Sequence, residues 1–188
     1  MFYIEDSKNL RLLVDNSMEF VDAASDGDLL KVKKLLDNGV NPDAQGPKGW
    51  TALRKSAVKN KYKITLELLN RGANVDAVNY TGHTALMMAC TYGHHEIAAL
   101  LLFYGANPNL TNCGGRTALM IAASYGYVHV VDTLVNANCR LDIHKTDRNG
   151  KSALQMAIDY GHEKVVTVLE AAHVKYSPDG TFKRCRYA

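Results

Sequence analysis

Apolar and polar positions along this chain follow a pattern that recurs about every 33 residues. Each copy opens with a hydroxyl residue, Ala and Leu, and successive copies start 33, 33 and 35 residues apart, at Thr51, Thr84, Thr117 and Ser152. A short segment with paired small residues follows, and then a longer segment with apolar residues at helical spacing, such as Ile97 to Leu102. The pattern predicts a short helix, a turn and a longer helix with an inward apolar face in every copy.

Gly marks the end of the longer helix in several copies, as at Gly72 and Gly105, where a left-handed cap is favoured. A weaker copy precedes the four, with Met18 in place of the hydroxyl residue. Repeats of this length predict a stack of helix pairs rather than one globular core. We therefore predict a leader or capping helix, five repeat units and a basic tail, at residues 1–15, 16–45, 46–78, 79–111, 112–146, 147–176 and 177–188.

The third unit carries the clearest motif, N-Y-T-G-H-T-A-L-M-M-A-C-T-Y-G-H, from Asn79 to His94. It resembles an ankyrin repeat, whose family pattern runs D-x-x-G-x-T-P-L-H-x-A-A-x-x-G-H, and the resemblance recurs in register along the other units. It implies an all-α ankyrin-repeat solenoid of stacked helix-turn-helix units, with a β-turn hairpin, called a finger below, before each short helix. The first and last units are expected to be atypical capping units.

Several positions depart from the family pattern. The His that follows the Leu is absent, and the residues in its place are Arg54, Met87, Met120 and Gln155. The hydrogen bonds that this His makes to neighbouring fingers are therefore expected to be lost or replaced. Arg54 with Lys55 predicts that this edge of the second unit is partly solvated or ion-paired. Asn60 and Asn138 replace glycines, and Asn tolerates the left-handed backbone better than most residues with a Cβ.

Composition and motifs exclude several classes of function. The formal net charge is +3, and no apolar run is long enough for a membrane span or a secretory signal. The chain has no phosphate-binding loop, nucleophile elbow, zinc-protease motif or kinase motif, which predicts no enzyme activity, no cofactor and no small-molecule substrate. Its four cysteines form no C-x-x-C pair, so neither a disulfide framework nor a metal site is expected. A monomeric cytoplasmic protein is predicted, with the nucleus as a second possible location.

The resemblance implies a concave binding face, formed by the fingers and by the ends of the short helices. The residues carried over to it as partner-binding are Lys48, Trp50, Lys59, Tyr80, His83, Tyr92, Arg116, Tyr125, Arg148, Lys151 and Tyr160. Tyr92, Tyr125 and Tyr160 occupy the same position in three units and are predicted to form a tyrosine ladder, which favours binding. The alternative is that each ring only packs on the next helix. Trp50, the single tryptophan, is required by nothing in the repeat and is a stronger indication of binding.

The same face is basic. It carries five Lys or Arg residues against Asp26 and Asp159, which predicts binding of an acidic or mixed-charge segment of another protein. Alternatively, these charges only keep the face soluble. Nucleic-acid binding through the basic aromatic groove is a rival function that the modest net charge disfavours, and a regulatory or targeting arm of a larger enzyme or effector is another. Two additional residues within 140–150 predict a longer fifth finger, with Arg148 projecting further than its equivalents.

Overall fold

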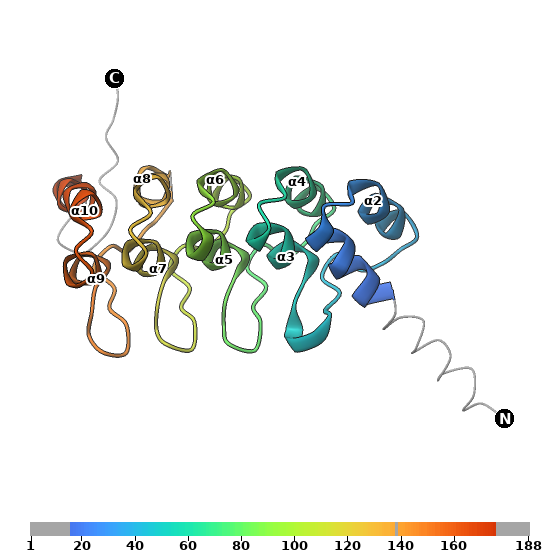
Figure 1. The fold of residues 1–188 in the computed structure, drawn as a ribbon, viewed down its shortest axis with the longest axis horizontal. Coiled ribbons are helices and arrows are strands. Elements are labelled where there is room, and N and C mark those ends of the chain that lie inside the picture. The colour runs from blue at the N-terminus through green and yellow to red at the C-terminus, as the bar shows by residue number, and fades with distance from the viewer. Residues whose placement is uncertain (1–15, 138, 176–188) are drawn as a thin grey trace, which may run out of the picture.

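The computed structural model describes residues 16–137 and 139–175, and its helices form two stacked layers (Figure 1). The inner layer consists of the short helices, at residues 16–26, α3 (Ala52–Val58), α5 (Ala85–Tyr92), α7 (Ala118–Ser124) and α9 (Ala153–Asp159). The outer layer consists of α2 (Leu29–Asp37), α4 (Tyr62–Asn70), α6 (His95–Phe103), α8 (Val128–Asn136) and α10 (Glu163–Lys175). No strand occurs within the described ranges, and the predicted all-α solenoid is confirmed.

The recurrent hydroxyl residue begins each short helix from the second unit onward. Its side-chain oxygen accepts the backbone N–H three residues later, as Thr84 Oγ1 does from Met87 at 3.2 Å and Ser152 Oγ from Gln155 at 3.2 Å. An N-terminal cap of this kind satisfies one of the amide groups that a helix leaves unpaired at its start. The repeated Thr or Ser therefore sets where every inner helix starts.

Small residues let the inner helices approach their neighbours closely. Ala57, Ala89, Ala122 and Ala157 are all fully buried. The outer helices cover them with pairs of large apolar side chains four residues apart, such as Ile97 and Leu101, which are also fully buried. Because each unit buries its apolar face against both neighbours, the core is continuous along the stack rather than divided among units.

The turn between inner and outer helices requires a left-handed backbone. Gly126 has φ of 73°, and a Cβ built on it would lie only 2.6 Å from Nδ1 of His162, so both backbone and space require glycine there. Asn60 takes the equivalent place in the second unit with φ of 53°, as expected for Asn. Asn138 and the leader and tail lie outside the described residues.

The loops that follow the outer helices are linked from unit to unit by side chains. The carboxylate of Asp43 accepts the backbone N–H of Asn74 at 2.8 Å, and the carboxylate of Asp76 accepts that of Asn107 at 3.0 Å. The two additional residues of the fourth unit lie in this loop, between α8 and the fifth finger. The expectation of a longer fifth finger is therefore wrong, because its tip has the same length as those of the third and fourth.

Candidate protein-binding face

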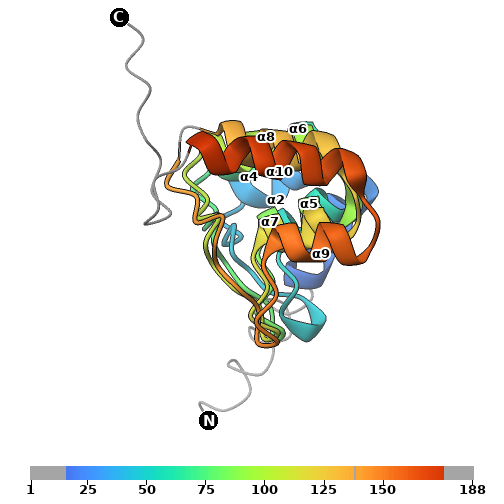
Figure 2. The same ribbon diagram turned by 90° about the vertical axis from the view of Figure 1, so that its left-hand side faces the viewer.

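The fingers precede the inner helices and project away from both helix layers, which gives each unit an L shape in cross-section (Figure 2). We define the second to fifth fingers as residues 46–51, 79–84, 112–117 and 147–152. With the inner helices they form the face to which the predicted partner-binding residues belong.

A side-chain oxygen braces each of the last three fingers from within. Asn79 Oδ1 accepts the backbone N–H groups of Thr81 at 3.1 Å and His83 at 2.8 Å. Asn112 does the same in the fourth finger, and Asp147 does so in the fifth. The turn is therefore held by its own first residue, and its side chains are presented in a fixed geometry.

Backbone hydrogen bonds also join these three fingers to one another. Cys113 donates its N–H to the carbonyl of Thr81 at 3.1 Å, and Arg148 donates its N–H to the carbonyl of Gly114 at 3.3 Å. His83 adds a side-chain link, because its ring lies 2.9 Å from Thr81 Oγ1 and 3.1 Å from Asn112 Nδ2. Burial lowers the pKa of His83, so this ring favours the neutral form and organises the fingers.

The second finger is built differently. Gly46 stands where the other fingers have Asn or Asp, so no side chain braces this turn. The tip is a short 3-10 helix, Pro47–Gly49, in which Lys48 has a left-handed φ of 59°. The ring of Tyr80 lies against Gly49, but across residues 46–51 and 79–84 no backbone hydrogen bond joins this finger to the third. The second finger therefore has fewer restraints than the others.

Arg54 is fully buried beneath this finger, at 0% exposure. Its guanidinium carbon lies 5.4 Å from the centre of the Trp50 ring, and Nη1 donates to the carbonyl of His83 at 3.4 Å. Nε and Nη2 have no hydrogen-bond partner among the described residues, and burial lowers the pKa of Arg54 to about 10. The expectation that Arg54 lies on a solvated or ion-paired edge is wrong, since its side chain is fully buried against the Trp50 ring and the carbonyl of His83.

The predicted tyrosine ladder lies at the ends of three successive inner helices. Tyr92, Tyr125 and Tyr160 are 52%, 55% and 58% exposed. Each stacks on the ring two residues later, with centroids 6.2, 5.9 and 6.4 Å apart, and these partner rings belong to His94, Tyr127 and His162. The rings are thus partly packed and partly accessible, and both interpretations of the ladder describe a part of their surface.

Ion pairs reduce the positive charge of the face. Lys151 Nζ lies 2.6 Å from a carboxylate oxygen of Asp159, and Arg116 Nε lies 3.7 Å from one of Asp147. Asp147 was not among the residues predicted for this face, although it starts a finger. Hydrogen bonds from the backbone N–H of Lys151, aided by Arg116, lower the pKa of Asp147. No ion pair of Lys48, Lys59 or Arg148 occurs among the described residues.

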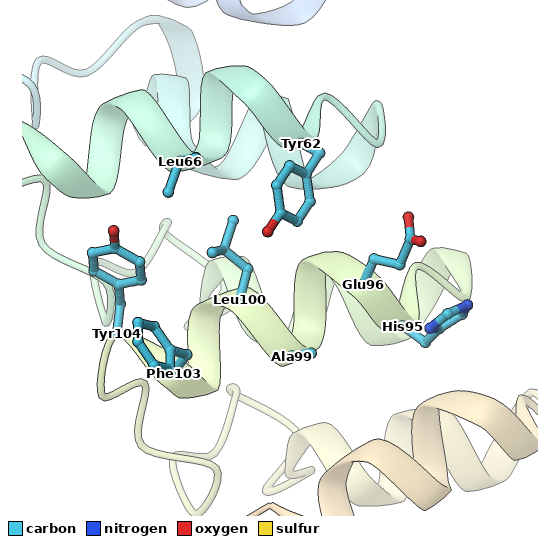
Figure 3. Close-up of a pocket in the computed structure, with 8 residues that line it drawn as sticks. All are labelled: Tyr62, Leu66, His95, Glu96, Ala99, Leu100, Phe103 and Tyr104. Carbon is cyan, nitrogen blue, oxygen red and sulfur yellow. The ribbon is translucent and has the colours of Figure 1, made fainter.

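A hollow lies between the outer helices α4 and α6 (Figure 3). It is on the side of the molecule away from the fingers, which is called the convex side below. It has a volume of about 760 Å³, and Tyr62 and Leu66 point into it from α4. Phe103, 84% exposed, stands at its edge. The equivalent position holds Asp37 in α2, Asn70 in α4, Asn136 in α8 and Ala171 in α10. Comparison of this position across the repeats would have identified the exposed Phe from sequence.

A metal site, a membrane span and a reactive cysteine each require particular features of the described residues. They hold no group of three or more His, Cys, Asp or Glu side chains that could bind a metal ion. In the same ranges, no helix has the length and apolar character needed to cross a membrane. Cys90 is buried, which raises the pKa of its thiol, whereas Cys113 is exposed near a finger tip.

Stacked helix pairs with projecting fingers define a solenoid repeat protein, a class in which a surface shared among repeats binds other molecules. A family model described as ankyrin repeats (3 copies) matches residues 20–112 and 101–177, and the chain therefore belongs to the ankyrin repeat family. Members of this family are generally protein–protein interaction modules and are typically non-catalytic. No curated protein sequence shows significant similarity to the chain.

Proposed function

We propose that this protein is a non-catalytic module that binds an acidic or mixed-charge segment of another protein along its fingers and inner helices. It acts as a monomer. The observation that supports this most directly is the half-exposed ladder of Tyr92, Tyr125 and Tyr160, which presents three equivalent aromatic rings on successive repeats. Rigid aromatic side chains with a polar end are typical of binding hot spots.

The fingers contribute both rigidity and charge to this function. Because Asn79, Asn112 and Asp147 fix the last three fingers before binding, little conformational entropy remains to be lost when a partner binds. Lys59 and Arg148 make no ion pair within the described residues and attract carboxylates over several ångströms. The expected interface is therefore preorganised, aromatic and sensitive to salt.

The decisive experiment removes two of the three tyrosine side chains of the ladder. We expect Tyr92→Ala with Tyr125→Ala to weaken binding of a partner captured from cell lysate by about 2 kcal/mol or more, the range of hot-spot truncations, with the melting temperature nearly unchanged. Calorimetric titration and thermal unfolding measure the two quantities. Phe103→Asn, which restores the Asn of the neighbouring outer helices on the convex side, is the matched control and should leave affinity unchanged.

Two other results would contradict the proposal. If the double variant kept its affinity and Phe103→Asn lost affinity, the partner would bind at the convex hollow instead. A large fall in melting temperature of the double variant would show that the tyrosines mainly pack. Lys151 and Arg116 pair with carboxylates, so three of the five cations predicted for this face make no ion pair among the described residues, a small number for phosphate contacts, which favours a protein over a nucleic acid. Titration with single-stranded DNA and RNA at low and moderate salt checks that alternative.

A further inference from the structure

One edge of the Arg54 guanidinium has no partner. Nη1 donates to the carbonyl of His83, whereas Nε and Nη2 are buried without any hydrogen bond. The N–H groups of these two nitrogens lie in the guanidinium plane and point outward along the same edge, so together they match the two oxygens of a carboxylate. A buried charge with unsatisfied donors is costly and is seldom retained in a native structure without a role.

An aromatic ring lies against the Arg54 guanidinium, and a second cation lies against the same ring. Lys55 Nζ lies 4.8 Å from the centre of the Trp50 ring, so two cations share the same ring. No ion pair of Arg54 or Lys55 occurs within the described ranges. By contrast, Arg116 at the fourth finger faces the carboxylate of Asp147. The positive charge beneath the second finger is therefore complementary to a carboxylate.

The cover over Arg54 belongs to the finger that has the fewest restraints. Trp50 ends the tip of the second finger, which lacks the bracing side chain that Asn79 provides in the third. It also lacks a backbone hydrogen bond to the third finger, and Lys48 holds a left-handed conformation that is unfavourable for a residue with a Cβ. Movement of this finger would break no backbone hydrogen bond to the third finger, and it would part Trp50 from Arg54 and from the core on which its ring packs.

We propose that the Nε–Nη2 edge of Arg54 binds the carboxylate of an Asp or Glu side chain of the partner segment, after the Trp50 ring moves off it. Lys55 adds a second positive charge beside this site. The inference rests on the proposed function and specifies the acidic group that the face recognises. It also explains why a cation occupies a position that holds Met87 and Met120 in the next two repeats.

The test uses the full chain and a displayed library of short random peptides. Peptides retained by the wild type and lost by the Tyr92→Ala/Tyr125→Ala variant are synthesised with each Asp or Glu replaced in turn by Asn or Gln. The Kd of every peptide is then measured for the wild type and for Arg54→Met. Gln155→Met, which introduces Met at the equivalent but exposed position of the fifth repeat, is the control.

We expect one carboxylate in each peptide whose replacement weakens binding to the wild type about tenfold or more, as charge-assisted hydrogen bonds do. The same replacement should change the Kd for Arg54→Met less than about twofold. For Gln155→Met it should weaken binding as much as for the wild type. Arg54→Lys keeps the positive charge but lacks the paired N–H donors, so its affinity should also depend little on the peptide carboxylate. Fluorescence of Trp50 should shift to longer wavelength on peptide binding, because its ring becomes solvated.

Several outcomes would overturn the inference, and they are distinguishable from failure of the proposed function. The Arg54 site would be refuted if replacing a peptide carboxylate weakened binding equally in the wild type and in Arg54→Met. It would also be refuted if the peptides depended on the tyrosines but needed no carboxylate. Either result would leave the proposed function standing. Failure to recover any tyrosine-dependent peptide would refute both. Arg54→Met is expected to melt no lower than the wild type, since it matches the neighbouring repeats, so loss of coupling would not reflect unfolding.

Discussion

The second and third repeats build the same pair of helices with different solutions at equivalent positions. Where the third repeat has Asn79 to brace its finger, the second has Gly46. Where the third has the buried apolar side chain of Met87, the second has the buried cation of Arg54. Two positions that fix the inner helices are nevertheless the same in both, namely the capping Thr51 or Thr84 and the buried Ala52 or Ala85 that follows it. The two repeats therefore differ in the finger and in what lies beneath it.

This difference shows where the chain contains features that destabilise the folded state. A left-handed Lys48, an unbraced turn and an unsatisfied guanidinium each destabilise the folded state, and all three lie within or below one finger. The core beneath the third repeat contains none of them. Local sequence rules are usually broken where function requires it, and the concentration of these departures at the second finger indicates that it serves recognition rather than stability.

The largest effect is expected when the chemistry of the second repeat is moved into the third. Met87→Arg should lower the free energy of unfolding by about 3 kcal/mol or more, because the site is 1% exposed and His83, rather than a Trp, stands above it. Urea unfolding measures the change, and Met87→Leu, expected to cost less than about 1.5 kcal/mol, is the volume control. If Met87→Arg were as stable as the leucine variant, the second repeat would not be exceptional in enclosing a cation.

An intermediate effect is expected from removal of the finger brace. Asn79→Ala should cost about 1–2 kcal/mol, since it leaves the N–H groups of Thr81 and His83 without their shared acceptor. The reverse change, Gly46→Asn, should slow amide hydrogen exchange in the second finger, because its Cβ would meet Val21 only at an ordinary contact distance of 3.5 Å. Unchanged exchange in Gly46→Asn, alongside a stable Asn79→Ala, would show that the brace does not restrain the fingers.

Much of the fold could be predicted from sequence because it depends on local chemistry that recurs. Thr84 caps the helix that starts beside it, and Ala89 lies where the pattern places a small residue against the next helix. Asn60 adopts the left-handed turn that its position in the repeat required. Each of these predictions needed only the register of one repeat relative to the next.

The site was less predictable because its properties arise between repeats. A charged residue such as Arg54 is normally placed at a solvated edge, and only the fold shows Trp50 and the carbonyl of His83 enclosing it. The ion pair of Arg116 with Asp147 likewise joins successive fingers, which spacing alone does not reveal. The position of the two additional residues could have been found from sequence, since Asp147 precedes Ser152 by the same interval as Asn79 precedes Thr84.

The smallest effect concerns the charge of the brace, which is Asn in the third finger and Asp in the fifth. Asp147→Asn keeps the acceptor oxygen and loses the ion pair with Arg116, so it should cost at most about 1 kcal/mol at neutral pH. The folded-state pKa of Asp147 is lowered, so its carboxylate stabilises the fold above its unfolded pKa, near 4, and this contribution is lost as pH falls through the lower folded value. Urea midpoints at pH 7 and below pH 4 should therefore converge for wild type and Asp147→Asn in acid. A gap that persisted or widened in acid would mean that the hydrogen-bonded geometry, rather than the carboxylate charge, distinguishes the two fingers.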